Sequence, residues 1–150
     1  MPYPETEFMQ AVEQQDMKLV KSLLSNPDLK AKYKARALQI ASANGHLGIA
    51  SLLLENVKPS LKVRDCLIPA IGNGHMNIIE KVLEDPKVNP GQAGNVALAH
   101  ACQHNQAKAV TRLLKDKRVS LLGGIQNPLA LALALGHHSV VDAISAHVEN

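Results

Sequence analysis

Aromatic side chains are almost absent from this sequence of 150 residues, which has no tryptophan, two tyrosines and one phenylalanine. Because 46% of the residues are nevertheless hydrophobic, a core must be built from Leu, Ile, Val and Ala. Such a composition suits closely packed helices better than β-sandwiches, which favour β-branched and aromatic residues. With few aromatics for base stacking and a formal net charge of only +3, the sequence does not indicate a nucleic-acid partner.

Cysteines and long apolar runs are also scarce. Cys66 and Cys102 are too few for a disulfide framework, which indicates a reducing compartment. The longest apolar run, residues 128–136, falls short of the roughly 18 residues that span a bilayer. The N-terminus lacks the basic and apolar regions of a secretory signal. We therefore expect a soluble, cytoplasmic protein with no membrane insertion.

A repeated pattern is what the sequence does contain. Each copy has a Leu or Phe three residues before an alanine, and a stretch with apolar residues at i, i+3 and i+4 follows. This pattern predicts two short helices in each copy. The copies align on Ala11, Ala41, Ala70, Ala101 and Ala132, 29 to 31 residues apart. We predict one domain, 1–150, of five units: 6–35, 36–64, 65–95, 96–126 and 127–150.

Local signals mark where the helices of a unit begin. Thr6, Asp65 and Asn127 occupy equivalent positions at which an N-cap is expected. Pro69 lies one turn into its helix, so that helix should start late or be distorted.

A Gly-His pair recurs between the two helices, at 45–46, 74–75 and 136–137. The glycine is interpreted as a left-handed helix stop and the histidine as the opening of the next helix. The segment ALQIASANGHLGIASLLL resembles the ankyrin-repeat pattern A-A-x-x-G-H followed by an apolar helix, and NPLALALALGHH is similar to the T-P-L-H-x-A opening. In the first and fourth units Gln15 and Asn105 replace the glycine, and Gln106 replaces a histidine.

The ankyrin resemblance covers about residues 6–150 and implies an all-α solenoid of stacked helix-turn-helix units. The period is shorter than the family's 33 residues, so the inter-repeat β-hairpins should be short or absent. Compact repeats of this kind also resemble ankyrin proteins of intracellular bacteria, some of which are secreted effectors. Polar residues in the first unit, and His138, Asp142, Ser145 and Glu149 in the last, predict capped ends, a complete protein and a monomer.

Two sets of residues could support chemistry. His100 and His104 are four apart on a helix, as two metal ligands would be, but no third ligand is evident. A metal- or thiol-dependent enzyme using His100, Cys102 and His104 is the alternative function. A small buried thiol at Cys66 or Cys102 is the simpler interpretation, and we expect neither catalysis nor a metal nor another cofactor.

The basic residues gather between the helix pairs, and we expect them in loops. The favoured interpretation is charge that complements helix C-termini and aids solubility, and the alternative is a basic edge for an acidic partner or membrane surface. The residues are Lys30, Lys32, Lys34 and Arg36, then Lys58, Lys62 and Arg64, then Lys115, Lys117 and Arg118.

The exposed face of the first helices is the predicted functional surface. It carries the pairs Gln10/Gln14, Ile40/Asn44, Pro69/Asn73, His100/His104 and Leu131/Leu135. In ankyrin proteins this face helps to line a concave groove, so the resemblance implies a non-catalytic module that binds another protein there. Leu131/Leu135 could instead support self-association, or be buried by the C-terminal tail. The predicted partner-binding residues are Tyr33, Asn44, Arg64, Asn73, Gln103, His104, Leu131 and Leu135.

Overall fold

Helices follow one another in pairs along the chain in the computed structural model, which describes residues 3–122 and 127–150. Within those residues the chain forms no β-strand, as predicted. The boundary predicted at residue 126 lies outside them. The elements are α1 (Pro4–Glu13), α2 (Met17–Leu24), α3 (Ala31–Asn44), α4 (Leu47–Leu54), α5 (Pro59–Lys62), the π-helix η1 (Val63–Leu67), α6 (Ile68–Gly72), α7 (Met76–Leu83), α8 (Gln92–Gln103), α9 (Ala107–Leu114), α10 (Pro128–Leu135) and α11 (His138–Glu149).

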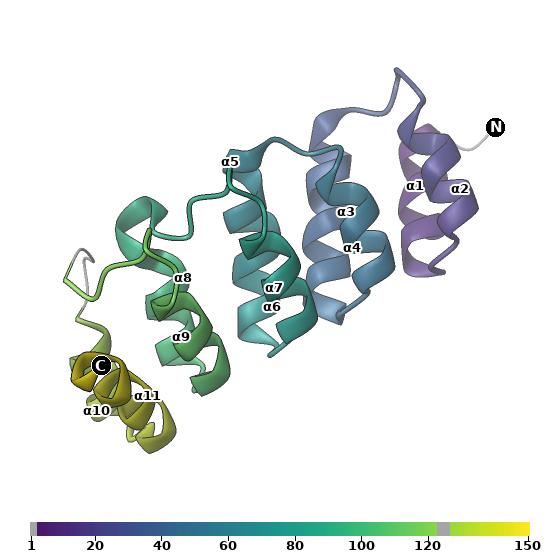
Figure 1. The fold of residues 1–150 in the computed structure, drawn as a ribbon. Helices are drawn as coiled ribbons and strands as arrows, with labels where there is room; N and C mark the ends of the chain where they lie inside the picture. Colours follow the sequence, from purple (N-terminus) through teal and green to yellow (C-terminus); the bar gives the residue numbers. More distant parts are fainter. Residues whose placement is uncertain (1–2, 123–126) are drawn as a thin grey trace.

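The pairs stack in a single row from α1 and α2 at one end to α10 and α11 at the other (Figure 1). The first helices α1, α3, α6, α8 and α10 pack side by side in one layer, and α2, α4, α7, α9 and α11 form the second. This two-layered stack is the all-α solenoid predicted from the repeats.

The core lies between the layers and between successive pairs. Phe8, Leu38, Leu67 and Leu98, each three residues before an aligned alanine, are fully buried. Burying one such side chain contributes about 1.5–3 kcal/mol, so the repeated positions hold the stack together.

The histidines of two Gly-His pairs, His75 and His137, join their units to the units before them. Gly45 ends α3 in the left-handed conformation, with φ of 75°, as predicted. The His75 ring of the following unit lies over Gly45, where an added Cβ would come within 2.7 Å of it, and its Nε2 is 3.0 Å from the Ala43 carbonyl oxygen. His137 makes a similar contact one position earlier in the preceding first helix, with Nδ1 2.8 Å from the Cys102 carbonyl oxygen.

Two units make this turn without glycine. Gln15 and Asn105 have φ of 57° and 56°, so both keep the left-handed conformation that glycine would adopt more easily. The backbone requirement of the repeat is therefore met in every unit, although the residue type varies.

Only one of the three predicted N-caps is confirmed. The Asn127 side chain accepts hydrogen bonds from the next two backbone N–H groups of α10, at 3.0 and 3.2 Å. Thr6 is not a cap because α1 already begins at Pro4, whose fixed φ suits the first position of a helix. Asp65 is not a cap because it lies inside η1.

The distortion predicted at Pro69 is confirmed. A proline has no N–H to donate to the carbonyl of Asp65, four residues earlier. The chain responds just before Pro69 by widening into η1, where the Ile68 N–H donates to the Val63 carbonyl five residues back. One helical run thus changes from α5 through η1 to α6.

The prediction that the basic residues lie in loops is wrong for the first two groups. Lys32, Lys34 and Arg36 lie inside α3, Lys62 ends α5, and Arg64 lies in η1. Their charges cluster near helix N-termini, where the dipole does not favour cations. Lys34 nevertheless meets a helix C-terminus, because its Nζ donates to the Leu24 carbonyl at the end of α2 at 3.5 Å, and Lys62 pairs with Asp85.

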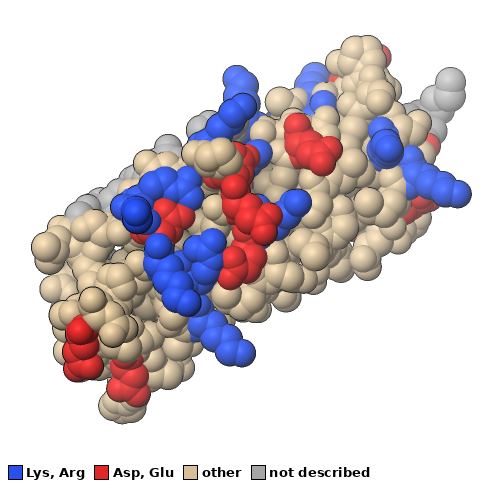
Figure 2. All heavy atoms as spheres, in the orientation of Figure 1, with Lys and Arg blue, Asp and Glu red and all other residues tan. Residues whose placement is uncertain are grey.

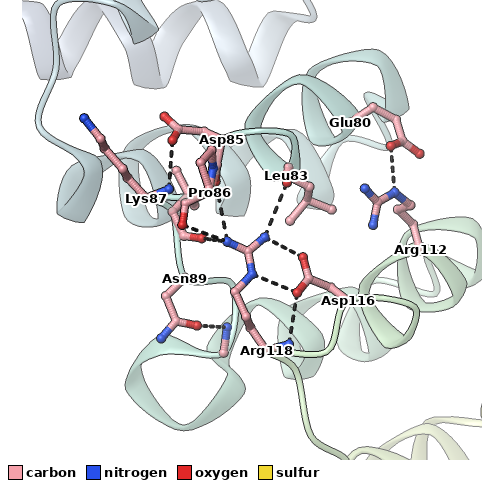
Figure 3. A network of polar contacts seen from close by, with 11 residues as sticks. Glu80, Leu83, Asp85, Pro86, Lys87, Asn89, Arg112, Asp116 and Arg118 are labelled. Atoms are coloured by element: carbon pink, nitrogen blue, oxygen red, sulfur yellow. Dashed lines mark hydrogen bonds and ion pairs between the residues drawn. The ribbon is translucent and has the colours of Figure 1, made fainter.

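The third basic group does follow a helix, and its Arg118 connects two loops (Figure 3). The guanidinium donates to the carbonyls of Leu83, at 3.3 Å, and of Val88, both after or at the end of α7. Asp116 holds it from the other side, with Nε and Nη2 donating at 2.8 and 2.6 Å. Arg118 thereby ties the fourth unit to the third.

The two ends of the stack differ, and the polar end predicted for the last unit is wrong for α10. In α11 the predicted polar residues His138, Asp142, Ser145 and Glu149 are exposed as expected. In α10, however, Leu129 and Leu133 are 36% and 58% exposed, although their equivalents in earlier units are fully buried. The stack therefore ends on leucines.

Candidate functional site

A hollow of about 750 Å³ lies along the layer of first helices, where α3, η1, α6 and α8 are neighbours. Its walls combine apolar side chains with basic and amide groups and contain no Asp or Glu. It is lined by Arg36, Gln39, Ile40, Ala43, Arg64, Ile68, Pro69, Gly72, Asn73, His100 and His104.

Small residues make room for the hollow. Ala43 and Gly72 occupy the same position of successive first helices, three residues after Ile40 and Pro69. A Cβ on Gly72 would come within 3.1 Å of His100 Nε2, so the glycine lets the imidazole of α8 lean over α6. Pro69 and Ile68 supply an apolar surface beside it.

Two histidines face each other at one side of the hollow. The rings of His100 and His104 have their centroids 4.2 Å apart and are tilted by 44°. Burial lowers the pKa of His100, and the neighbouring charge of His104 lowers it further. His100 is therefore neutral at pH 7 and becomes cationic only in more acidic solution.

Two arginines, Arg36 of α3 and Arg64 of η1, also line the hollow. Arg36 has no ion-pair partner among the residues that the structure describes. Arg64 donates from Nε and Nη2 to the Asp65 carboxylate, both at 3.2 Å, yet its side chain is 74% exposed and keeps donors free for a ligand. The hollow thus presents cationic donors around an apolar floor.

Several charges elsewhere on the stack are paired. One broad face shows red and blue side chains lying side by side over its middle (Figure 2). The second helices and adjoining loops carry the Arg112–Glu80 pair, at 2.7 Å, and Lys62 reaches Asp85 at 2.7 Å. The hollow differs from these places because no carboxylate lines it.

A family model for ankyrin repeats, in three copies, matches residues 8–121. The chain belongs to the ankyrin-repeat family. Ankyrin repeats are generally protein–protein interaction modules and are typically non-catalytic. In the described part of this ankyrin-repeat chain, every helix is too short or too polar to cross a bilayer.

The structure brings three of the predicted partner-binding residues together. Arg64, Asn73 and His104 all line the hollow, and Asn73 also donates from Nδ2 to the Pro69 carbonyl at 3.0 Å. Tyr33 lines a smaller neighbouring hollow with Met9, Lys32 and Arg36.

The other predicted residues lie apart from the hollow. Asn44 and Gln103 are exposed near the ends of α3 and α8 but do not line it. Leu131 is half-buried and Leu135 is 48% exposed, both in α10 at the end of the stack. Burial of Leu135 by the C-terminal tail, one of the alternatives, is therefore wrong.

Sequence reasoning missed Arg36, Gln39 and Ile68 as lining residues. Arg36 lies one turn before Ile40, on the same side of α3, and Ile68 directly precedes Pro69. Extending each predicted pair by one turn toward the helix N-terminus would have found Arg36. Because the basic residues were expected in loops, Arg36 was not recognised as part of this helix face.

The two thiols are poorly suited to nucleophilic chemistry. Burial raises the pKa of both Cys66 and Cys102 to about 11, so they stay protonated at neutral pH. Cys66 accepts a hydrogen bond from the Ser42 hydroxyl at 3.0 Å. His137 contacts the backbone of Cys102, with Nδ1 2.8 Å from its carbonyl oxygen.

Metal-ligand geometry was the other chemical candidate. In residues 3–122 and 127–150, no three His, Cys, Asp or Glu side chains come together in a group that could hold an ion. The His100/His104 pair stands without a third such ligand within that range.

Proposed function

We propose that this chain is a non-catalytic interaction module that binds an acidic segment of a partner protein across the hollow between α3, α6 and α8. The observation that carries the proposal is the lining itself, in which Arg36, Arg64 and two histidines surround apolar side chains without a carboxylate. Arginine donors recognise carboxylates in a fixed, fork-like geometry. Ile40 and Ile68 would receive an apolar side chain of the same segment.

The rigidity of the solenoid supports this function. The lining residues lie on helices whose positions are fixed by buried neighbours, so little ordering would accompany binding. Tyr33, Lys32 and Met9 extend the surface toward α1, while Asn44 and Gln103 flank it. A role as a cytoplasmic scaffold or adaptor, or as a bacterial effector delivered into a host cell, would use this same surface.

Selection from a random peptide library displayed against the folded chain tests the proposal. We expect the selected peptides to be enriched in Asp and Glu next to a large apolar residue. Arg36→Glu should weaken their binding at least tenfold, about 1.4 kcal/mol, because it places a carboxylate in the hollow. Lys108→Glu, the same charge change at an exposed position of α9, is the matched control and should leave binding unchanged.

Two results would contradict the proposal. One is a set of selected peptides without acidic enrichment. The other is an equal effect of Arg36→Glu and Lys108→Glu, because it would mean that total charge, and not the hollow, determines binding. Circular dichroism confirms that both variants remain folded.

A further inference from the structure

The π-helix η1 shifts the repeat of the third unit by one residue. In the other four units the residue two positions before the aligned Leu or Phe is exposed, and these residues are Thr6, Arg36, Val96 and Asn127. In the third unit the residue two positions before Leu67 is Asp65, which is only 6% exposed. The exposed residue there is Arg64, one position earlier. The third unit therefore has one extra residue between its aligned leucine and its exposed position.

The wide turn of η1 accommodates this extra residue. The Ile68 N–H donates to the Val63 carbonyl five residues back, where an α-helix would use the carbonyl four residues back. Each residue of an α-helix turns the chain by about 100°, so an inserted residue changes which side chain points outward before the turn. An uninterrupted α-helix running back from Leu67 would put Asp65 at the position that Arg36 has in α3. The π-turn puts Arg64 there and turns Asp65 inward.

This shift determines the charge of the hollow. The elements α3 and η1 pack against each other, and Arg36 and Arg64 both line the hollow, whereas Asp65 does not. At the position of Arg64 an α-helix would present a carboxylate in place of a guanidinium. That exchange would reverse the local charge and turn the attraction of an acidic segment into repulsion. The absence of carboxylates from the lining thus depends on η1.

The inward position of Asp65 is stable because Arg64 pairs with it. The Asp65 carboxylate accepts hydrogen bonds from Arg64 Nε and Nη2, both at 3.2 Å. A buried carboxylate without such partners would be strongly unfavourable. The Arg64 side chain is nevertheless 74% exposed and has more N–H donors than these two contacts use. Arg64 therefore satisfies the buried acid and still offers donors to a ligand.

We propose that the π-turn of η1 determines the specificity of the hollow for acidic segments, because it presents Arg64 together with Arg36 and keeps Asp65 out of the lining. This role of η1 rests on the proposed function, since it concerns the segment that the hollow binds. A shift of helical register in a single unit, with the same residues, would reverse the preference.

A charge-conserving exchange tests the role in binding. The double variant Arg64→Asp/Asp65→Arg keeps the net charge but puts a carboxylate at the exposed position. We expect it to weaken binding of the most enriched acidic library peptide, labelled with fluorescein, by about tenfold or more in fluorescence anisotropy. The matched control is Glu80→Arg/Arg112→Glu, which exchanges an ion pair outside the hollow and should leave the peptide affinity unchanged.

The peptide titrations separate this proposal from the proposed function. Equal or tighter peptide binding by the Arg64→Asp/Asp65→Arg chain, while Arg36→Glu still weakens binding, would overturn the role of η1 and leave the proposed function intact. A library that yields no acidic peptide would instead reject the proposed function, and the role of η1 with it.

Thiol reactivity tests the register without any peptide. Arg64→Cys should react with a maleimide as fast as Arg36→Cys, and Asp65→Cys as slowly as Ala37→Cys, because Ala37 is fully buried in the regular helix α3. The two native thiols are buried and contribute only a slow background. Slow labelling of Arg64→Cys would show that residue 64 does not face outward and would overturn the proposal, even if Asp65→Cys does not fold. Fast labelling of a folded Asp65→Cys chain would overturn it equally.

Discussion

Replacing Arg118 with alanine should destabilise the stack more than replacing any other paired arginine. The Arg118 side chain is 31% exposed, and it donates to Asp116, whose carboxylate is only 9% exposed, and to carbonyls following α7 (Figure 3). A hydrogen bond to a charged group contributes about 1.5–3 kcal/mol, and partial exposure lowers that figure. We therefore expect Arg118→Ala to cost about 2 kcal/mol, since it also leaves Asp116 without its cation.

Arg112 supplies the matched control. It also joins the fourth unit to the third, through Glu80 at 2.7 Å, but the two side chains are 27% and 44% exposed. Exposed pairs of this kind contribute about 0.2–1 kcal/mol, so Arg112→Ala should have a small effect. Arg118→Lys should retain part of the stability, because an ammonium keeps the charge but cannot reproduce the forked contacts.

Urea titrations followed by circular dichroism measure these differences. For a chain of this length about 2 kcal/mol corresponds to a fall in melting temperature of roughly 4–8 °C. Arg118 lowers the pKa of Asp116, chiefly through its side-chain hydrogen bond. The stabilisation from this pair is thus complete above the unfolded carboxyl pKa and is lost as the pH falls through the lower folded pKa. Equal costs for Arg118→Ala and Arg112→Ala at pH 7 would refute this reasoning.

Three further predictions concern the backbone and the histidines. Gln15→Gly should raise the free energy of unfolding by about 1 kcal/mol, because a left-handed non-glycine residue costs about 1–2 kcal/mol; Asn105→Gly should gain less, since it removes a side-chain hydrogen bond to the last unit. An unchanged urea midpoint for Gln15→Gly would contradict this. Gly91→Ala should cost at least ~2 kcal/mol, measured by thermal melting, because its Cβ would lie 2.1 Å from the Arg118 carbonyl oxygen. His100→Asn should reduce the loss of stability in acid, because the lowered pKa of His100 gives a contribution that is present above about pH 6.5 and lost as the pH falls to its folded pKa. Thermal melts of the unmodified chain and of His100→Asn at a series of pH values measure this loss. An equal fall in stability of the two proteins toward low pH would be evidence against the prediction.

The solenoid could be predicted from the sequence because its signals are local and repeated. Phe8 and its equivalents mark the core, and Gly45 marks the helix stop, without knowledge of any distant contact. Asn127 was recognisable as a cap for the same reason. Thr6 and Asp65 were misassigned because the proline at Pro4 and the widened turn before Pro69 move the helix boundaries away from the repeated pattern.

The candidate site was only partly predictable. Asn73 and His104 followed from their places in the repeat, but Arg36 and Arg64 were assigned to loops because they lie in clusters of basic residues. Whether a lysine-rich segment is a loop or the start of a helix depends on packing between units. Likewise, Leu133 is 58% exposed although its equivalents in earlier units are fully buried, and no local pattern distinguishes it from them.

The cross-unit contacts made by the histidines have a consequence for how the stack opens. His75 and His137 bond back to the second and fourth units, and Arg118 bonds back to the third. Between the first and second units, the described side chains supply one long hydrogen bond, from Lys34 Nζ to the Leu24 carbonyl at 3.5 Å, in addition to the packing of their helices. Local unfolding in a solenoid proceeds from its weakest neighbour contact. The amide hydrogens of α1 and α2 should therefore exchange with solvent first, because the first unit unfolds before the others.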